Sequence, residues 1–161
     1  MTTAYLALGA NLGDRQEAIA RALAALAAAG VRVAARSPLY ETDPVAPEPQ
    51  PLYLNAAARV ETALSARALL DTCLDVERAL GRVRPAGRPV AARVIDIDLL
   101  LYDDRVINEP DLVVPHPRLL ERPFVRIPLA DVAAPGLVHP LTREPLDRAS
   151  PSPSVRCRGG A

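Results

Sequence analysis

Hydrophobic and polar positions switch between strand-like and helix-like spacing over the first third of the chain. Residues 5–9 form a short apolar run typical of a strand. Asp14 follows with an acidic residue three positions later, which is the spacing of a helix N-terminus with its capping acid. Apolar residues then recur at helical spacing, and Gly30 is placed to end this helix. Residues 31–36 indicate a second strand, and residues 41–51 a loop punctuated by prolines.

The middle of the chain repeats this order of elements. Residues 52–62 alternate between apolar and polar positions, which predicts a strand with one buried face. Ser65 can cap a helix that runs to about Leu80 and ends before Gly81. A loop broken by Gly and Pro, residues 82–93, then leads into a last apolar strand. The expected faces of the 52–62 strand are Leu54, Ala56, Ala58 and Val60 on one side, and Tyr53, Asn55, Arg59 and Glu61 on the other.

The predicted order is strand, helix, strand, strand, helix, strand. This is the ferredoxin-like βαββαβ arrangement of the α+β class, an antiparallel sheet with helices packed on one face. We expect one domain over residues 1–142. Residues 143–161 are polar and rich in proline and small residues, which favours a flexible tail. His139 has no polar constellation around it, so we expect it at the surface.

A pair of aspartates interrupts the last apolar strand. Residues 93–102 read RVIDIDLLLY. Side chains two residues apart in a strand share a face, so Asp96 and Asp98 are expected to stand side by side. Adjacent like charges repel unless a cation or a proton lies between them, and Mg²⁺ binds one or two carboxylates together with phosphates. An isolated pair of this kind is more often a solvated strand edge. The other face is expected to fill the core with Ile95, Ile97, Leu99 and Leu101.

Four arginines lie directly upstream of the aspartates, in a segment without an acid. Guanidinium groups bind phosphate oxygens in a two-point geometry, and a Gly/Pro loop can close over a ligand. All 19 basic residues are arginine, which excludes a Walker-type phosphate loop because that loop needs its lysine. A solvated basic loop is the alternative. Joined to the carboxylate strand, the arginines predict a site for a metal ion and a polyphosphate: Arg82, Arg84, Arg88 and Arg93.

Composition narrows the possible partners. The formal net charge is zero, so no overall basic field indicates nucleic acid or an anionic membrane as a partner. RNA-binding sheets present several aromatics in a basic surround, whereas this chain has four tyrosines, one phenylalanine and no tryptophan. No apolar run approaches a membrane span. We expect a soluble, cytoplasmic protein with neither a membrane nor a nucleic-acid partner.

Four further residues could bring polar groups to a site. Tyr53 and Asn55 combine a stacking ring with a two-way amide on one strand face, which suits a flat heterocycle, although ordinary sheet packing would explain them equally well. Glu77 lies near the end of its helix, where an acid opposes the helix dipole and needs another favourable contact. His116 lies between two prolines, and a lone histidine there is more often structural than catalytic.

Six motifs occur in an order that resembles one known family, the 6-hydroxymethyl-7,8-dihydropterin pyrophosphokinases of folate biosynthesis. The resemblance covers residues 4–140, and each motif would be weak alone. The motifs are YLALGANLGDR, LYETDPV, QPLYLNAA, ERALGRVR, RVIDIDLLLYDDRVIN and VPHPRLLERPFVRIPL.

This resemblance implies transfer of pyrophosphate from MgATP to the hydroxymethyl oxygen of 6-hydroxymethyl-7,8-dihydropterin, with release of AMP. It also implies the site residues, and we expect a monomer. The catalytic residues would be Arg82, Arg93, Asp96 and Asp98, of which the two aspartates would bind two Mg²⁺ ions. The nucleotide would contact Leu70, Glu77, Arg84, Arg88, His116 and Arg122. The pterin would contact Thr42, Asp43, Val45, Tyr53, Asn55 and Phe124.

Some positions depart from the pattern of that family. Leu74, Asp111 and Val113 replace polar or basic residues that are common at the nucleotide site, and the loop reads RPVAAR where an aromatic is frequent. A ferredoxin-like module that binds a ligand or RNA without catalysis is the alternative function. An inactive relative would have lost an aspartate or a loop arginine, and none is lost.

Overall fold

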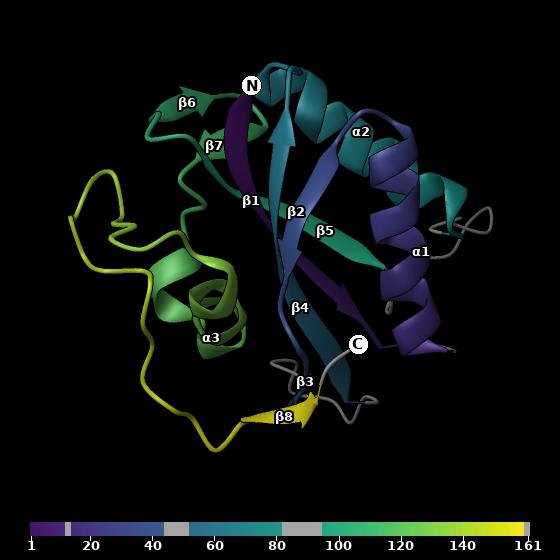
Figure 1. The fold of residues 1–161 in the computed structure, drawn as a ribbon, viewed down its shortest axis with the longest axis vertical. Coiled ribbons are helices and arrows are strands. Elements are labelled where there is room, and N and C mark those ends of the chain that lie inside the picture. Colours follow the sequence, from purple (N-terminus) through teal and green to yellow (C-terminus); the bar gives the residue numbers. More distant parts are fainter. Residues whose placement is uncertain (12–13, 44–51, 82–94, 160–161) are drawn as a thin grey trace.

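A six-stranded antiparallel sheet with helices on both faces forms the body of the protein (Figure 1). The computed structural model describes residues 1–11, 14–43, 52–81 and 95–159. In chain order the elements are β1 (Thr2–Ala10), α1 (Arg15–Ala28), β2 (Arg32–Arg36), β3 (Leu39–Thr42), β4 (Tyr53–Thr62), α2 (Ala66–Ala79), β5 (Asp96–Tyr102), β6 (Ile107–Glu109), β7 (Leu112–Val114), the 3₁₀ helix η1 (Leu119–Glu121), α3 (Pro123–Val132) and β8 (Val155–Gly159).

The ferredoxin-like prediction is confirmed by the succession β1, α1, β2, β4, α2, β5. The strand order in the sheet is β5-β1-β4-β3-β8, and β2 also pairs with β4. One half of the long strand β4 pairs with β2 and the other half with β3. Between β2 and β3, the Ser37 N–H donates to the carbonyl of Ala57, and the Ala57 N–H donates to the Ser37 hydroxyl. The sequence pattern missed β3, because four residues before a proline-rich stretch give too short an alternation to recognise.

Both predicted helix starts are confirmed by hydrogen bonds. The Asp14 carboxylate accepts from the backbone N–H of Glu17 at 3.0 Å, and the Ser65 hydroxyl accepts from that of Ala68 at 3.1 Å. Gly30 follows the C-cap of α1 with φ of +90°, a left-handed conformation that glycine adopts without strain. These signals are local in sequence, which is why they could be read from it.

Each face of the sheet has its own hydrophobic cluster. Helices α1 and α2 cover the face that includes Leu54 and Val60 of β4, as predicted for that strand. Helix α3 covers the opposite face and packs on Leu100 and Ala57, and Figure 1 shows it across the sheet from the other two. The sequence pattern predicted only a short apolar stretch in the region of α3, so this third helix is an addition to the predicted fold.

The predicted face assignment in β5 is right for Ile97 and Leu99 and wrong for Leu101. The register between β5 and β1 shifts after Leu99, so that Leu100 is an extra residue in the ladder. Leu100 and Leu101 therefore both belong to the α3 side, and Tyr102 returns to the first cluster. A β-bulge of this kind breaks the two-residue period, and a run of leucines gives no sign of it.

The segment after Arg143, predicted as a flexible tail, instead packs on the domain. Leu146 is 1% exposed within the α3-side cluster, and β8 pairs with β3. His139, expected at the surface, is 5% exposed, and its Nδ1 accepts from the backbone N–H groups of Leu141 and Thr142. Proline-rich composition suggested disorder after Arg143, but Leu146 and β8 make contacts with residues distant in sequence. Within the described residues, no helix is long and apolar enough to cross a membrane.

Candidate active site

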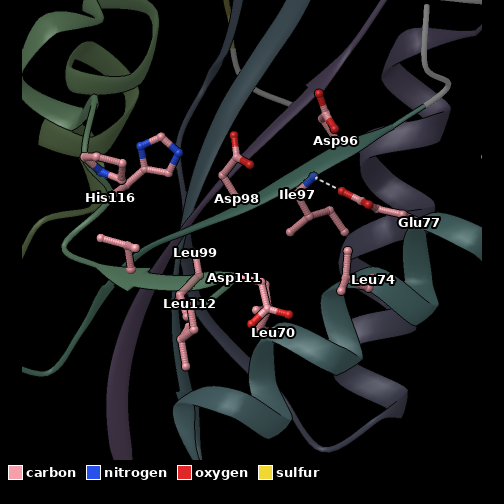
Figure 2. Close-up of a pocket in the computed structure, with 12 residues that line it drawn as sticks. Leu70, Leu74, Glu77, Asp96, Ile97, Asp98, Leu99, Asp111, Leu112 and His116 are labelled. Atoms are coloured by element: carbon pink, nitrogen blue, oxygen red, sulfur yellow. Dashed lines mark hydrogen bonds between the residues drawn. The ribbon is translucent and has the colours of Figure 1, made fainter. Parts of the chain in front are cut away.

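The two aspartates of β5 line a pocket of about 370 Å³ (Figure 2). Asp96 and Asp98 are both partly exposed, while the residues between and beside them are buried. This confirms that the carboxylates share the face opposite Ile95 and Ile97. The residues that line the pocket come from α2, β5, the β6–β7 hairpin and the segment after β7: Leu70, Leu74, Glu77, Asp96, Ile97, Asp98, Leu99, Asp111, Leu112, Val113, His116 and Pro117.

Glu77 ties helix α2 to the strand that carries the aspartates. Its carboxylate accepts a hydrogen bond of 2.7 Å from the backbone N–H of Ile97, and the side chain is 2% exposed. Strand β5 lies at the edge of the sheet, so this N–H needs an acceptor outside the ladder. The bond is drawn in Figure 2. This hydrogen bond is the favourable contact that we expected for Glu77, whose charge opposes the dipole near the end of its helix.

His116 is fixed beside Asp98 by two backbone contacts. Its own N–H donates to the carbonyl of Leu100 at 2.9 Å, and its Nδ1 accepts from the backbone N–H of Arg118 at 3.2 Å. Burial lowers the pKa of His116 below 6.5, and Arg122 and Arg118 lower it further, while Asp98 opposes them. The imidazole is therefore neutral near pH 7, with its proton on Nε2 because Nδ1 is an acceptor.

Asp111, one of the unusual positions of the sequence, is held by an ion pair. Arg67 of α2 donates to its carboxylate at 2.7 Å and to that of Glu109 at 3.0 Å. These contacts link the β6–β7 hairpin to α2. Leu74 and Val113 line the same pocket, so the three positions at which the sequence departs from the expected pattern lie together.

A second group of predicted residues lies at the junction of β3 and β4. The Thr42 hydroxyl donates to Oδ1 of Asn55, and both side chains are buried. This bond orients the amide so that its Nδ2 is presented as a donor. Gly9 of β1 lies opposite Asn55 in the ladder, and a Cβ at Gly9 would lie 2.9 Å from that Nδ2. The close approach of Gly9 to Asn55 was not predicted from the sequence, because only the pairing of β1 with β4 shows which residue faces Gly9.

Arg122 and Phe124 lie at the start of α3. The guanidinium carbon of Arg122 is 5.6 Å from the centre of the Phe124 ring, within cation–π range. Phe124 packs against the α3-side cluster, which includes residues of β1 and β5. Strand alternation places Tyr53, Asn55 and the aspartates on this same face of the sheet.

The sequence matches one protein family over most of its length. The model of the 7,8-dihydro-6-hydroxymethylpterin-pyrophosphokinase (HPPK) family matches residues 5–134. The chain belongs to the HPPK family. A 2-amino-4-hydroxy-6-hydroxymethyldihydropteridine pyrophosphokinase of Methylorubrum extorquens is 46% identical over 155 residues, which cover 94% of this chain and 96% of that protein. The enzyme of the same name from Bacillus subtilis is 42% identical over 130 residues, which cover 80% of this chain and 77% of that one.

Longer proteins contain an HPPK region as one part. The folic acid synthesis protein fol1 of Schizosaccharomyces pombe is 41% identical over 157 residues, and the match covers 95% of this chain but 21% of fol1. The crystal structure of wild-type HPPK-DHPS from Plasmodium falciparum superposes with a TM-score of 0.69 at 15% identity, over 91% of this chain and 43% of that one. The chain thus spans less than half of these solved structures, and at this identity they support the fold alone.

The structure brings together only part of the predicted HPPK site. One pocket unites Leu70, Glu77, Asp96, Asp98 and His116. The β3–β4 group consists of Thr42, Tyr53 and Asn55. The start of α3 contributes Arg122 and Phe124. The exposed Asp43 forms an ion pair with Arg156 of β8. The remaining predicted residues, for which the structure gives no position, lie outside the described ranges: Val45, Arg82, Arg84, Arg88 and Arg93.

Proposed function

We propose that Asp96 and Asp98 bind MgATP and that the β,γ-pyrophosphoryl group of ATP passes to 6-hydroxymethyl-7,8-dihydropterin. The hydroxymethyl oxygen forms the new bond to the β-phosphorus and gives up its proton. The bond from that phosphorus to the oxygen it shares with the α-phosphate breaks, and AMP leaves. Membership of the HPPK family supports the reaction. The single observation that supports its location is the pocket that contains both aspartates, Glu77 and His116.

The aspartates fit Mg²⁺ as the metal. In the part of the chain that the structure describes, no group of three or more His, Cys, Asp or Glu side chains could hold an ion. The carboxylates of Asp96 and Asp98 suit Mg²⁺, because this ion usually binds one or two carboxylates, keeps water and takes other ligands from substrate phosphates. We propose that Asp96 and Asp98 would hold two Mg²⁺ ions. When bound, they neutralise charge that develops on the phosphates.

The remaining residues of the pocket hold and orient the triphosphate. The neutral His116 can donate its Nε2–H to a phosphate oxygen, and Arg122 can bind phosphate oxygens at two points. Glu77 fixes β5, and therefore both aspartates, through Ile97. Transfer at phosphorus depends mainly on such alignment and charge neutralisation. We assign the same phosphate-binding role to Arg82, Arg84, Arg88 and Arg93, and a place against the nucleotide to Leu70.

The pterin ring is proposed to bind on the α3 side of the sheet. Tyr53 and Phe124 would stack on the two faces of the pterin ring. Asn55, oriented by Thr42, is to hydrogen-bond its edge, and the backbone near Asp43 and Val45 is to complete the pocket. We also propose that the enzyme acts as a monomer in the cytoplasm.

An AMP-release assay tests this function. Purified protein with Mg²⁺, ATP and 6-hydroxymethyl-7,8-dihydropterin is expected to produce AMP and the pterin diphosphate in equal amounts. The control omits the pterin. AMP at the level of that control would refute the enzyme and leave a ligand-binding module.

A further inference from the structure

The C-terminal strand β8 lies against the strand that carries the proposed pterin residues. β3 has four residues, of which Tyr40, Glu41 and Thr42 have partners in β4. On its other side β3 pairs with β8, and Figure 1 shows the two strands next to each other at one end of the sheet. Without β8, this short strand would be an edge of the sheet with one row of unpaired backbone groups.

Arg156 of β8 fastens the end of β3. Its Nη2 donates to the carboxylate of Asp43 at 2.9 Å, and its Nη1 donates to the carbonyl of Pro153 at 3.1 Å. The backbone N–H of Asp43 also donates to the carbonyl of Ser154 at 3.2 Å. One guanidinium therefore bridges the residue that follows β3 and the turn that precedes β8.

A second ion-pair group extends this attachment to the rest of the domain. The carboxylate of Glu41 accepts from Arg158 of β8 at 3.3 Å and from Arg15 of α1 at 3.1 Å. Arg15 also donates to the carbonyl of Leu52 at 2.7 Å. Arg15 thus binds both Glu41, which precedes residues 44–51, and Leu52, which follows them. Glu41 also binds Arg158 of β8.

We propose that Arg156 is a positioning residue for the pterin, which holds Thr42 and Asp43 in register through β8. The inference rests on the proposed function. Thr42 is 2% exposed and orients Asn55. A shift at the end of β3 would therefore move the amide that is proposed to hydrogen-bond the edge of the pterin. The aspartates on β5 lie on the far side of β1 and β4 from β8. Loss of Arg156 is therefore expected to weaken pterin binding and to leave ATP binding unchanged.

Steady-state kinetics of full-length variants test this assignment. In Arg156→Ala the KM for the pterin is expected to rise about two- to fivefold, the range of an exposed ion pair, with kcat and the KM for ATP unchanged. Arg156→Glu should raise the pterin KM further, because it places two carboxylates together. Arg156→Lys should recover part of the loss, since an ammonium keeps the charge but not the two-point bridge.

A control variant and a structural readout separate positioning from general damage. Arg148→Ala removes an exposed arginine of the same C-terminal segment that pairs with its neighbour Asp147, and both KM values should stay at wild-type levels. Hydrogen exchange of the Asp43 amide should be faster in Arg156→Ala than in Arg148→Ala.

The outcomes distinguish this inference from the proposed function. Wild-type pterin KM in both Arg156→Ala and Arg156→Glu, with the wild-type enzyme active, would overturn the inference and leave the function standing. An equal rise in both KM values would also overturn it. If the wild-type protein releases no AMP, the proposed function fails, and the dissociation constant of the pterin in the same variants decides whether Arg156 positions a ligand.

Discussion

The proposed phosphate side and the proposed pterin side of the site differ in how charged and polar groups are arranged. On the phosphate side, Asp96 and Asp98 place two carboxylates together on one strand. On the pterin side, polar groups are matched within the protein, as in the hydrogen bond from Thr42 to Asn55 and the ion pair of Asp43 with Arg156. Concentrated like charge suits a cation and a polyphosphate, whereas matched groups of fixed orientation suit a neutral heterocycle.

The two sides also differ in what holds them. Strand β5 is fixed by a helix side chain, because Glu77 accepts from the N–H of Ile97. Strand β3 is fixed by strand pairing with β4 and β8. A change at Glu77 should therefore affect mainly the phosphate side, and a change in β8, such as loss of Arg156, mainly the pterin side.

The largest effect is expected from neutralising one aspartate. Asp96→Asn or Asp98→Asn should lower kcat by about a hundred- to a thousandfold or more, because the charge that holds Mg²⁺ and offsets the transition state is lost. Pterin affinity should stay unchanged, and urea unfolding should show a stability close to wild type, because both side chains are partly exposed. The matched control is Asp104→Asn, on the exposed turn after β5, which should keep wild-type turnover. Undiminished turnover in the two site variants would refute the metal assignment.

Removing the support of β5 should have the next largest effect. Glu77→Ala leaves the buried N–H of Ile97 without its acceptor, which is expected to lower the free energy of unfolding by about 1–3 kcal/mol. Urea denaturation measures this. Asp75→Ala, an exposed residue of the same helix that pairs with Arg78, should change stability by less than about 1 kcal/mol. Equal losses in the two variants would mean that Glu77 does not support the strand.

Loss of a stacking ring should affect only the pterin side. Tyr53→Ala is expected to raise the KM for the pterin about two- to tenfold, while the KM for ATP stays at its wild-type value. Steady-state kinetics with each substrate varied in turn would show this split. A parallel rise in the KM for ATP would contradict the separation of the two sides.

The smallest effect is a shift in the pKa of His116. Burial lowers this pKa below 6.5, and Asp98 raises it in part, so Asp98→Asn should lower it further. Asp43→Asn, on the pterin side, should leave it unchanged. Titration of the imidazole by NMR measures both, and a wild-type pKa in Asp98→Asn would contradict the proximity of the two groups.

The same pKa shift sets the sign of a stability change with pH. As pH falls below 6.5, the unfolded chain takes up a proton at His116 before the folded protein does, so stability is full above 6.5 and is lost as pH falls. In His116→Gln this part of the pH dependence should be absent. Urea unfolding at pH 7 and pH 5 would show it as a smaller difference between the two conditions.

Much of the fold and part of the site could be predicted because the signals are local. The caps at Asp14 and Ser65, the faces of β4 and the shared face of Asp96 and Asp98 each follow from residues a few positions apart. Pairing with distant residues could not be predicted in this way. The contact of Gly9 with Asn55 and the pairing of β8 with β3 join parts of the chain that are far apart in sequence.

The sequence by itself determined the βαββαβ order, the carboxylate pair and the family, because periodicity and ordered motifs are properties of short segments. Only the tertiary structure decided that α3 covers the second face, that a bulge at Leu100 sends Leu101 to that face, and that the C-terminal segment joins the sheet. Composition could not reveal this last point: backbone hydrogen bonds to β3 and burial of Leu146 order a segment whose own residues favour disorder.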